Sequence, residues 1–263
     1  MSKKKINHVW KSGINHKKID FITRNTDIPL KVIFKAMCSY ASNPYHNFGH
    51  ALGVAETAIA IGQAQNLSRK DINIVALGGL HHDILHQGVV NINDELRSAI
   101  KTNLKLTDDE LTQCGLTVVD RTRLRDLIIS TTFTMHGKIR DPLAEIIQDA
   151  DISYMGKGPY MYLYACMGLV DEFGKQIDKT IDPVVFIRKS QKPFIEHVIS
   201  LSPNQDTFFL SPGAQKILQN PMDAIELLLS WKDNIFRLAY DLYKVDVDFD
   251  QFVKIIDNQR LLL

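Results

Sequence analysis

The placement of proline constrains the fold of this chain more than any other feature of its sequence. At four places a short polar residue directly precedes a proline, namely Asp141-Pro142, Asp182-Pro183, Ser211-Pro212 and Asn220-Pro221. Such a polar side chain caps a helix, and proline is favoured at the first helical position because the N–H it lacks has no intrahelical partner there. These pairs predict helix starts spread over the second half of the chain.

Helical signals also dominate the first half. Residues 51–65 repeat apolar or small side chains at helical spacing, and Thr107 followed by Glu110 matches a capping box. Ser68 precedes a second apolar helix expected over 71–80. Long alternating strand patterns are absent. We therefore expect one all-α domain, a compact helical bundle.

Residues after 200 are expected to complete this bundle. The stretch 202–212 is the most loop-like part of the chain, whereas 221–244 and 249–261 show the pattern of two amphipathic helices. The expected domain covers residues 1–263, with C-terminal helices over 212–263 that pack on the rest.

Composition excludes several classes of protein. The chain has 263 residues, is 45% hydrophobic and carries a net charge of +1, so it can bury a real core but has no strong field to attract nucleic acid or an acidic membrane. Cys38, Cys114 and Cys166 are odd in number and widely spaced, which indicates a reducing compartment without disulfides. Charged residues or prolines interrupt each apolar run, and Lys3-Lys4-Lys5 lacks an apolar signal segment behind it. We expect a cytoplasmic protein and leave its oligomeric state open.

Histidines gather in the stretch 45–92, which holds five of the nine in the chain. His46 and His50 are four residues apart, as are His82 and His86, so on a helix each pair would lie on one face. Neutral imidazoles beside carboxylates suit borderline divalent metals. The stretch therefore predicts a metal-binding or catalytic site.

These motifs resemble the HD superfamily of metal-dependent phosphohydrolases, and most closely the catalytic domain of cyclic nucleotide phosphodiesterases. Residues 82–92 read H-D-I-L-H-Q-G-V-V-N-I and match the signature H-D-apolar-x-H-x-G-x-x-N over its ten positions. Residues 45–51 match the motif that precedes it, and four later segments are similar to family segments in the same order: 128–136, 150–153, 172–178 and 189–195. The resemblance covers about residues 40–200 and implies an all-α hydrolase of phosphodiesters that acts on a small nucleotide.

The resemblance implies a set of metal ligands. A first divalent ion would be bound by His50, His82, Asp83 and Asp151, and the aspartates would reach a second ion through water. Two ions would activate a water molecule and neutralise charge on the phosphorus oxygens. The ligand types admit Zn, Mn, Fe, Ni or Mg. Asp149 competes with Asp151; the two do not share a helix face, and the match of 150–153 to A-D-L-S favours Asp151.

Further roles follow from the same resemblance. His46 would act as the general acid on the leaving oxygen, and His86 would form a hydrogen bond or bind the second metal. Asn47 lies within the first motif, Thr131 and His136 are expected near the metal waters, and Glu95 is a candidate to replace a family glutamate that supports the bridging hydroxide.

The remaining histidines are expected to have no part in the chemistry. On a helix His81 would face away from the metal, so we expect it to be structural. His8, His16 and His197 lack supporting context and are expected at the surface.

Substrate recognition rests on the last matching segments. Gln191 would offer a donor and an acceptor to a purine edge, and Phe194 would stack on the base with Leu169 across from it. Periodicity alone assigns Phe194 and Leu169 equally well to the core. The chain departs from the family where Tyr154 replaces the purine-contacting asparagine and Thr132 replaces an aspartate, and it lacks the family's E-N-H-H segment.

Three functions compete on this basis. The first is a metal-dependent phosphodiesterase that opens a 3′,5′-cyclic nucleotide or a related diester. The second is a broader HD phosphohydrolase acting on a nucleotide monophosphate or triphosphate. The third, a non-catalytic ligand-binding module, does not require His46 together with the complete metal set.

Overall fold

The structure, a computed structural model, describes residues 13–88, 93–203 and 206–262, and no strand occurs within these ranges. Its first half contains the helices α2 (Gly13–Asn25), α3 (Leu30–Met37), α4 (Phe48–Ala64), α5 (Arg69–His81), α6 (Asp94–Lys105), α7 (Asp108–Gln113), α8 (Asp120–Ser130), the short η1 (Phe133–Met135) and α9 (Pro142–Asp151). The second half contains η2 (Ser153–Gly156), α10 (Pro159–Gln176), α11 (Pro183–Phe186), η3 (Ile187–Gln191), α12 (Lys192–Leu201), α13 (Pro212–Ile217), α14 (Pro221–Leu229), α15 (Asp233–Lys244) and α16 (Phe249–Leu262). The expected all-α fold is confirmed.

The caps predicted from proline placement are all formed. Asp141, Asp182, Ser211 and Asn220 each accept a backbone N–H of the following helix, and each proline occupies its first turn. The capping box that begins at Thr107 is also complete. These caps are local features, which is why the sequence alone predicted where these helices begin.

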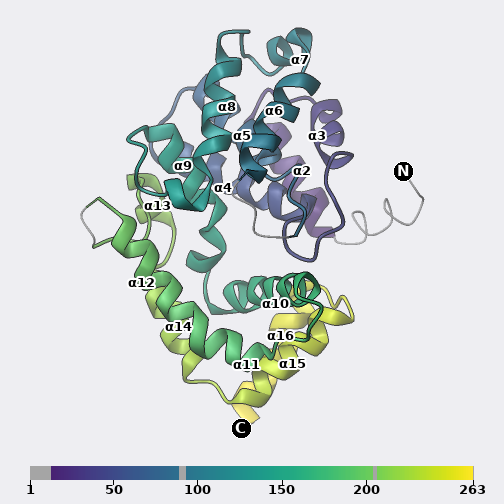
Figure 1. The fold of residues 1–263 in the computed structure, drawn as a ribbon, viewed down its shortest axis with the longest axis vertical. Helices are drawn as coiled ribbons and strands as arrows, with labels where there is room; N and C mark the ends of the chain where they lie inside the picture. Colours follow the sequence, from purple (N-terminus) through teal and green to yellow (C-terminus); the bar gives the residue numbers. More distant parts are fainter. Residues whose placement is uncertain (1–12, 89–92, 204–205, 263) are drawn as a thin grey trace.

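The helices form two groups, which Figure 1 shows one above the other. In the first group α4 is central and packs against α2, α5, α9 and α13. In the second group α10 packs against α14 and α15, and α15 packs against α16. The short α13 belongs to the second half of the sequence but lies in the first group, where it contacts α4 and α9.

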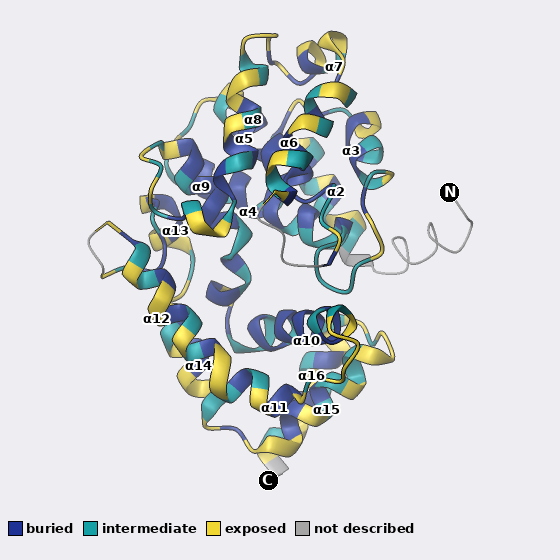
Figure 2. Cartoon of the chain, in the orientation of Figure 1, coloured by how far each residue is buried: buried dark blue, intermediate teal, exposed yellow. Residues whose placement is uncertain are grey.

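One hydrophobic core runs through both groups. It extends from Ile19 in α2 to Ile256 in α16, and dark blue segments mark its helices in Figure 2. Within it α4 and α5 approach closely, since a Cβ placed on Gly79 would stand 2.9 Å from the Ala55 nitrogen. Gly79 thus permits the close approach of the two helix backbones.

The sequence prediction of one helix over 221–244 is wrong. The chain forms α14 and α15 instead, separated by Ser230, Trp231 and Lys232. Trp231 is buried at this break, and Arg188 donates hydrogen bonds to the carbonyls of Leu229 and Trp231 at 2.9 and 2.7 Å. A distant side chain therefore satisfies the carbonyls at which the helix ends.

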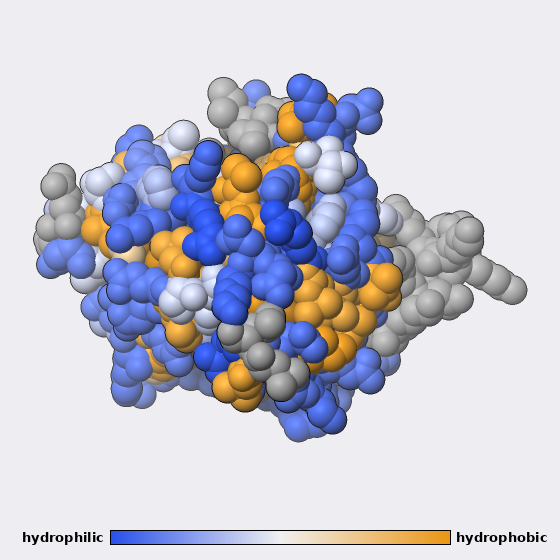
Figure 3. Space-filling view, turned by 90° about the horizontal axis from the view of Figure 1, so that it is seen from below, coloured by the Kyte–Doolittle hydropathy of each residue, from blue (hydrophilic) through white to orange (hydrophobic). Residues whose placement is uncertain are grey.

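The surface offers no membrane-crossing element within the described ranges, because no helix there is both long and apolar enough to span a bilayer. Seen from the end that carries the C-terminal helices, the surface alternates between hydrophilic and hydrophobic areas (Figure 3).

Cys38, Cys114 and Cys166 are all free. Residues 202–211 connect α12 to α13, which agrees with the predicted loop, although 204–205 lie outside the described residues.

Candidate metal centre

Asn47 fixes the start of α4 and with it the position of His50. Its side-chain oxygen accepts hydrogen bonds from the backbone N–H groups of Gly49 and His50 at 2.8 and 3.3 Å. His46 lies before this cap, so the prediction that His46 and His50 share a helix face is wrong. The turn at the cap nevertheless brings their ring centroids to 5.7 Å.

The second histidine pair is not helical either. Helix α5 ends at His81, so His82 is its C-cap and His86 lies beyond the following turn. The Gly79 carbonyl, which would accept from the Asp83 N–H in a continuing helix, instead lies 2.9 Å from Nδ1 of His82. The predicted shared face is therefore wrong, because the helix ends at the first member of the pair.

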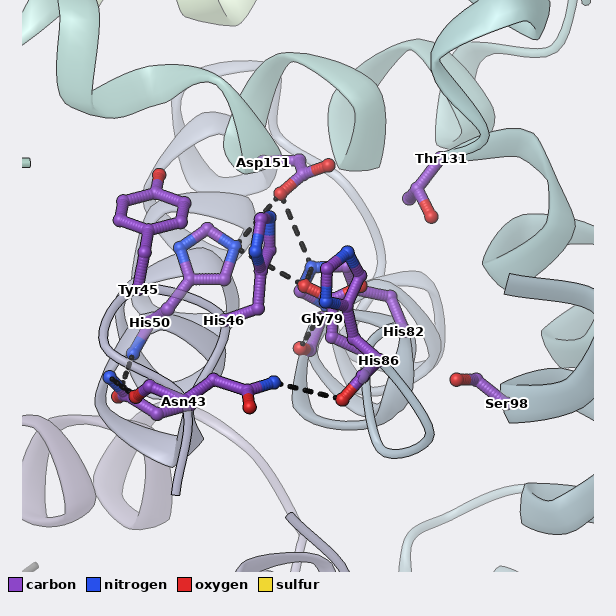
Figure 4. A network of polar contacts seen from close by, with 12 residues as sticks. Asn43, Tyr45, His46, His50, Gly79, His82, His86, Ser98, Thr131 and Asp151 are labelled. Atoms are coloured by element: carbon purple, nitrogen blue, oxygen red, sulfur yellow. Dashed lines mark hydrogen bonds and ion pairs between the residues drawn. The ribbon is translucent and has the colours of Figure 1, made fainter. Parts of the chain in front are cut away.

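The four predicted metal ligands do come together, as Figure 4 shows for His50, His82 and Asp151. One ligand atom from each of these residues and one from Asp83 all lie within 4.8 Å of one another. His82 Nε2 lies 2.9 Å from an Asp83 oxygen and 3.2 Å from an Asp151 oxygen, and His50 Nε2 lies 3.0 Å from the same Asp151 oxygen. The ligands come from α4, the turn after α5, and the end of α9.

The donor set fits a divalent cation. Because the Gly79 carbonyl can only accept, His82 carries a proton on Nδ1, and the Nε2 lone pair of neutral His82 then faces two carboxylates. His82 Nε2 is buried and makes no hydrogen bond of acceptable geometry among the described residues. Lone pairs that face one another in a buried space require a shared positive charge, which a second proton on His82 or a metal ion supplies.

The electrostatics of the cluster agree with this requirement. Burial works to raise the pKa of Asp83 and of Asp151, but the adjacent imidazoles outweigh it and hold both pKa values well below the usual range. Burial works to lower the pKa of His82, and the two carboxylates outweigh it and raise that pKa well above the ordinary value. Both aspartates therefore stay ionised, as metal ligands must.

Asp149, the competing carboxylate, has a different set of partners. It accepts hydrogen bonds from the backbone N–H groups of Leu210 and Ser211 at 2.8 and 2.7 Å, and from the Ser211 hydroxyl at 2.6 Å. It is fully buried, which raises its pKa to about 7. Asp149 therefore ties the end of α9 to the cap of α13, and Asp151 is the aspartate that faces the cluster.

Next to this cluster His46, His86 and Glu172 form a second group of titratable side chains. The rings of His46 and His86 are stacked, with centroids 3.8 Å apart (Figure 4). Nδ1 of His46 lies 2.5 Å from a Glu172 oxygen. One ligand atom from each of these three residues lies within 4.8 Å of the others, so the geometry admits both roles expected for His86, a hydrogen bond and a ligand of a second metal.

Glu172 holds His46 through three interactions. One carboxylate oxygen lies against the His46 ring, and the other accepts the backbone N–H groups of Tyr45 and His46 at 2.9 and 3.0 Å. Burial works to lower the pKa of His46, but the hydrogen bond to Glu172 and the surrounding carboxylates raise it above the ordinary value. Glu172 lies in the matched segment 172–178, but its role could not be predicted from the sequence.

Among the supporting candidates, Glu95 has a buried carboxylate that is influenced by the charges of the metal-site aspartates. It lies in the first turn of α6, and one of its oxygens is buried without a hydrogen-bond partner in the described structure. Burial and then the charges of Asp83 and Asp151 raise its pKa. The hydroxyl of Thr131 donates to the Ile128 carbonyl, and Thr131 stands apart from the histidines in Figure 4.

The other histidines are placed as follows. His81 is buried and bonds through Nδ1 to the Leu77 carbonyl at 2.9 Å, which fits its expected structural place. His136 is also buried, and burial lowers its pKa to about 4. His16 and His197 are exposed, as expected, whereas His8 lies outside the described residues, as do positions 89–92 of the signature.

The three predicted substrate contacts lie on different elements of the second helix group. Gln191 is buried at the end of η3 and accepts a hydrogen bond from the Tyr162 hydroxyl at 3.1 Å. Leu169 is buried in α10, whereas Phe194 in α12 is half-buried. The Phe194 ring stacks on Phe133 with centroids 5.3 Å apart.

Comparison with known proteins relates this chain to others by structure alone. No family model and no curated protein matches its sequence. The phosphodiesterase domain of the RhoPDE fusion protein from the choanoflagellate Salpingoeca rosetta matches with a TM-score of 0.55 at 16% identity, over 93% of both chains. Another structure of the Salpingoeca rosetta rhodopsin phosphodiesterase domain gives 0.57 at 15% identity, over 93% of this chain and 96% of that one. LmjPDEB1 in complex with IBMX gives 0.54 at 17% identity, over 85% of both chains.

The chain therefore has the all-helical fold of phosphodiesterase catalytic domains, as its motifs predicted. At this level of identity the likeness defines the fold.

Proposed function

We propose that this protein is a metal-dependent phosphodiesterase that hydrolyses a 3′,5′-cyclic nucleotide or a related phosphodiester. Its metal site consists of His50, His82, Asp83 and Asp151, whose ligand atoms lie within 4.8 Å of one another. A divalent ion bound there lowers the pKa of water and neutralises charge on the phosphoryl oxygens. Glu95 is the further carboxylate available to a second ion, since its oxygen is buried and unpartnered in the described structure.

The observation that carries this proposal is the His46–Glu172 pair beside the metal ligands. Glu172 accepts a hydrogen bond from the Nδ1–H group of His46, so Nε2 is the ring atom left to carry a proton for the substrate. The raised pKa of His46 favours the protonated form of the ring. His46 thus donates a proton to the leaving oxygen as a general acid. His86 packs against its ring and limits its orientation.

A substrate screen tests the proposal. The purified protein, with its metal content measured, is assayed against cyclic nucleotides, linear nucleotides and bis-nitrophenyl phosphate. We expect hydrolysis of the cyclic nucleotide and of the model diester. Release of phosphate from linear nucleotides alone would contradict the proposal.

The alternative, a broader HD phosphohydrolase of nucleotide monophosphates or triphosphates, is favoured by one observation. Tyr154 stands where the resembling family has its purine-contacting asparagine, and its ring packs against Tyr45 and Tyr162 with centroids 5.6 and 5.9 Å away. This position therefore lacks the amide that would read a purine.

Replacement of Gln191 separates the two functions. For Gln191→Ala we expect the kcat/KM for a cyclic purine nucleotide to fall about tenfold or more, because a hydrogen-bonding contact to the base is lost. The kcat/KM for bis-nitrophenyl phosphate should stay near the wild-type value, since that diester has no base. An equal loss on both substrates contradicts the base-binding role of Gln191.

A further inference from the structure

Two lysines from distant parts of the chain meet on one face of α4. Lys18 in α2 donates to the Gly49 carbonyl at 3.4 Å, and its Nζ lies 3.1 Å from the position that a Cβ on Gly53 would take. Lys157, which follows η2, donates to the hydroxyl of Thr57. Gly53 and Thr57 are one helical turn apart, so the two ammonium groups are neighbours along α4.

The charges of this pair are not balanced. Within the described part of the chain, neither Lys18 nor Lys157 forms an ion pair with a carboxylate, and Glu56 is the acidic residue near both. Burial lowers the pKa of Lys18, and burial together with the Lys18 charge lowers the pKa of Lys157 to about 8. Glu56 acts in the opposite direction on both but leaves one positive charge in excess.

The surface of α4 over Gly53 is open. Around the position of a Cβ on Gly53, Lys18 Nζ is the one heavy atom of a neighbouring element found within 4 Å among the described residues. Each ammonium group has three N–H donors and one hydrogen bond in the described structure. The hydroxyl of Thr57 is already engaged, since it donates to the Gly53 carbonyl and accepts from Ser153 and Lys157. Each lysine therefore has donors left for a ligand, beside a stretch of the α4 surface over Gly53 that no other described side chain fills.

We propose that Lys18 and Lys157 form a binding site for a tetrahedral oxyanion, either inorganic phosphate or the phosphate of a monoester, over Gly53 of α4. Such an anion accepts hydrogen bonds from both ammonium groups and neutralises their excess charge. Thr57 holds Lys157 in place for it. The site is separate from the metal cluster, because its donors are lysines that take no part in that cluster, and the inference is independent of the proposed function.

A calorimetric titration of the full chain with inorganic phosphate, and in a second arm with glycerol phosphate, tests this site at constant ionic strength. Lys18→Met and Lys157→Met each keep an apolar stem and remove one charged donor. Lys31→Met, on the exposed side of α3, is the matched control. We expect about tenfold weaker phosphate binding in each of the first two variants and wild-type binding in the control.

Glu56→Gln provides a test in the opposite direction. Removal of the acidic neighbour should tighten phosphate binding several-fold, whereas damage to the fold cannot produce a gain. Phosphate that binds at the metal cluster contributes equally to all variants, so differences among them report the lysine site. Binding in the phosphate arm alone assigns the site to the free ion, and binding in both arms assigns it to monoesters as well. Equal affinities in all variants, or no binding by the wild type, overturn the proposal.

Discussion

The chemistry available to each histidine of the site depends on the hydrogen-bond partner of one of its two ring nitrogens. The Gly79 carbonyl fixes the proton of His82 on Nδ1 and leaves Nε2 for a metal. Glu172 likewise holds a proton of His46 on Nδ1, and Nε2 is then the atom that would donate a proton to the substrate. The ring of His86 accepts the Gly88 N–H at 3.0 Å and so has the opposite arrangement. Three histidines that look alike in sequence thus differ in chemistry because their neighbours differ.

Replacement of Glu172 tests the orientation of the general acid. A general acid works only while protonated, so activity falls as pH rises through the pKa of His46. Glu172→Gln removes the charge that raises this pKa, and we expect the alkaline limb of the pH–rate profile to move to lower pH. His46→Ala should reduce kcat by about 10²–10⁴-fold, most for substrates with poor leaving groups. Both variants should keep their metal, as measured by elemental analysis; loss of metal from His46→Ala contradicts the assignment.

His136 gives a prediction for stability against pH. Burial lowers its folded-state pKa from the ordinary value of 6.5 to about 4. Between these values the unfolded chain binds a proton that the folded chain does not, so stability is present above pH 6.5 and is lost as pH falls toward 4. The loss amounts to at most about 3 kcal/mol. Urea unfolding of His136→Gln should show a flatter profile than the wild type, while His197→Gln, an exposed control, should keep the wild-type slope.

At the scale of single elements, local signals were predictable from sequence and long-range ones were not. The caps at Asp141, Asp182, Ser211 and Asn220 depend on two or three neighbouring residues, so the sequence alone placed them. The break between α14 and α15 depends on Arg188, which lies in η3 and is distant from the break in sequence. The start of α4 between His46 and His50 and the end of α5 before His82 were not predicted, because the spacing of four in each pair also fits an uninterrupted helix.

The contact of α4 with α5 at Gly79 gives a prediction at this scale. Alanine is the better helix former, yet a Cβ on Gly79 would meet the Ala55 backbone nitrogen at 2.9 Å. Backbone atoms cannot yield as a flexible side chain does, so we expect Gly79→Ala to destabilise the protein by about 1–3 kcal/mol and to weaken metal binding by moving His82 away from His50. Gly62→Ala is the matched control, since its nearest neighbour is the Leu67 side chain at 3.3 Å. Thermal unfolding and metal titration compare the two; equal effects would contradict this account.

At the scale of the whole molecule, the candidate site joins the two helix groups. The four residues predicted from the sequence as metal ligands do lie together, because each belongs to a motif with distinctive residues. It missed Glu172, whose role arises only when α10 packs beside the turn before α4, more than a hundred residues away in sequence. The substrate-binding roles of Gln191, Phe194 and Leu169 remain predictions.

Metal removal should act on the stability of the whole chain. The cation stabilises the folded state alone, since the unfolded chain does not assemble the four ligands, and an ion at a hundredfold excess over its Kd contributes about 2.7 kcal/mol. We therefore expect a chelator to lower the Tm of the wild type and to abolish turnover. Asp83→Ala should bind no metal and show no change of Tm with chelator, whereas Asp109→Ala, an exposed control, should behave as the wild type. A wild-type Tm that is insensitive to chelator contradicts a metal at this site.

The origin of Glu172 in α10 has a consequence for control of the reaction. The four proposed cation ligands and the proposed proton donor His46 belong to the first helix group, whereas Glu172, the carboxylate that orients His46, belongs to the second. The orientation of His46 therefore depends on how α10 packs against the first group. A small displacement of α10 would move Glu172 away from His46 without moving the four proposed metal ligands, so metal binding would persist while the proposed proton transfer is lost.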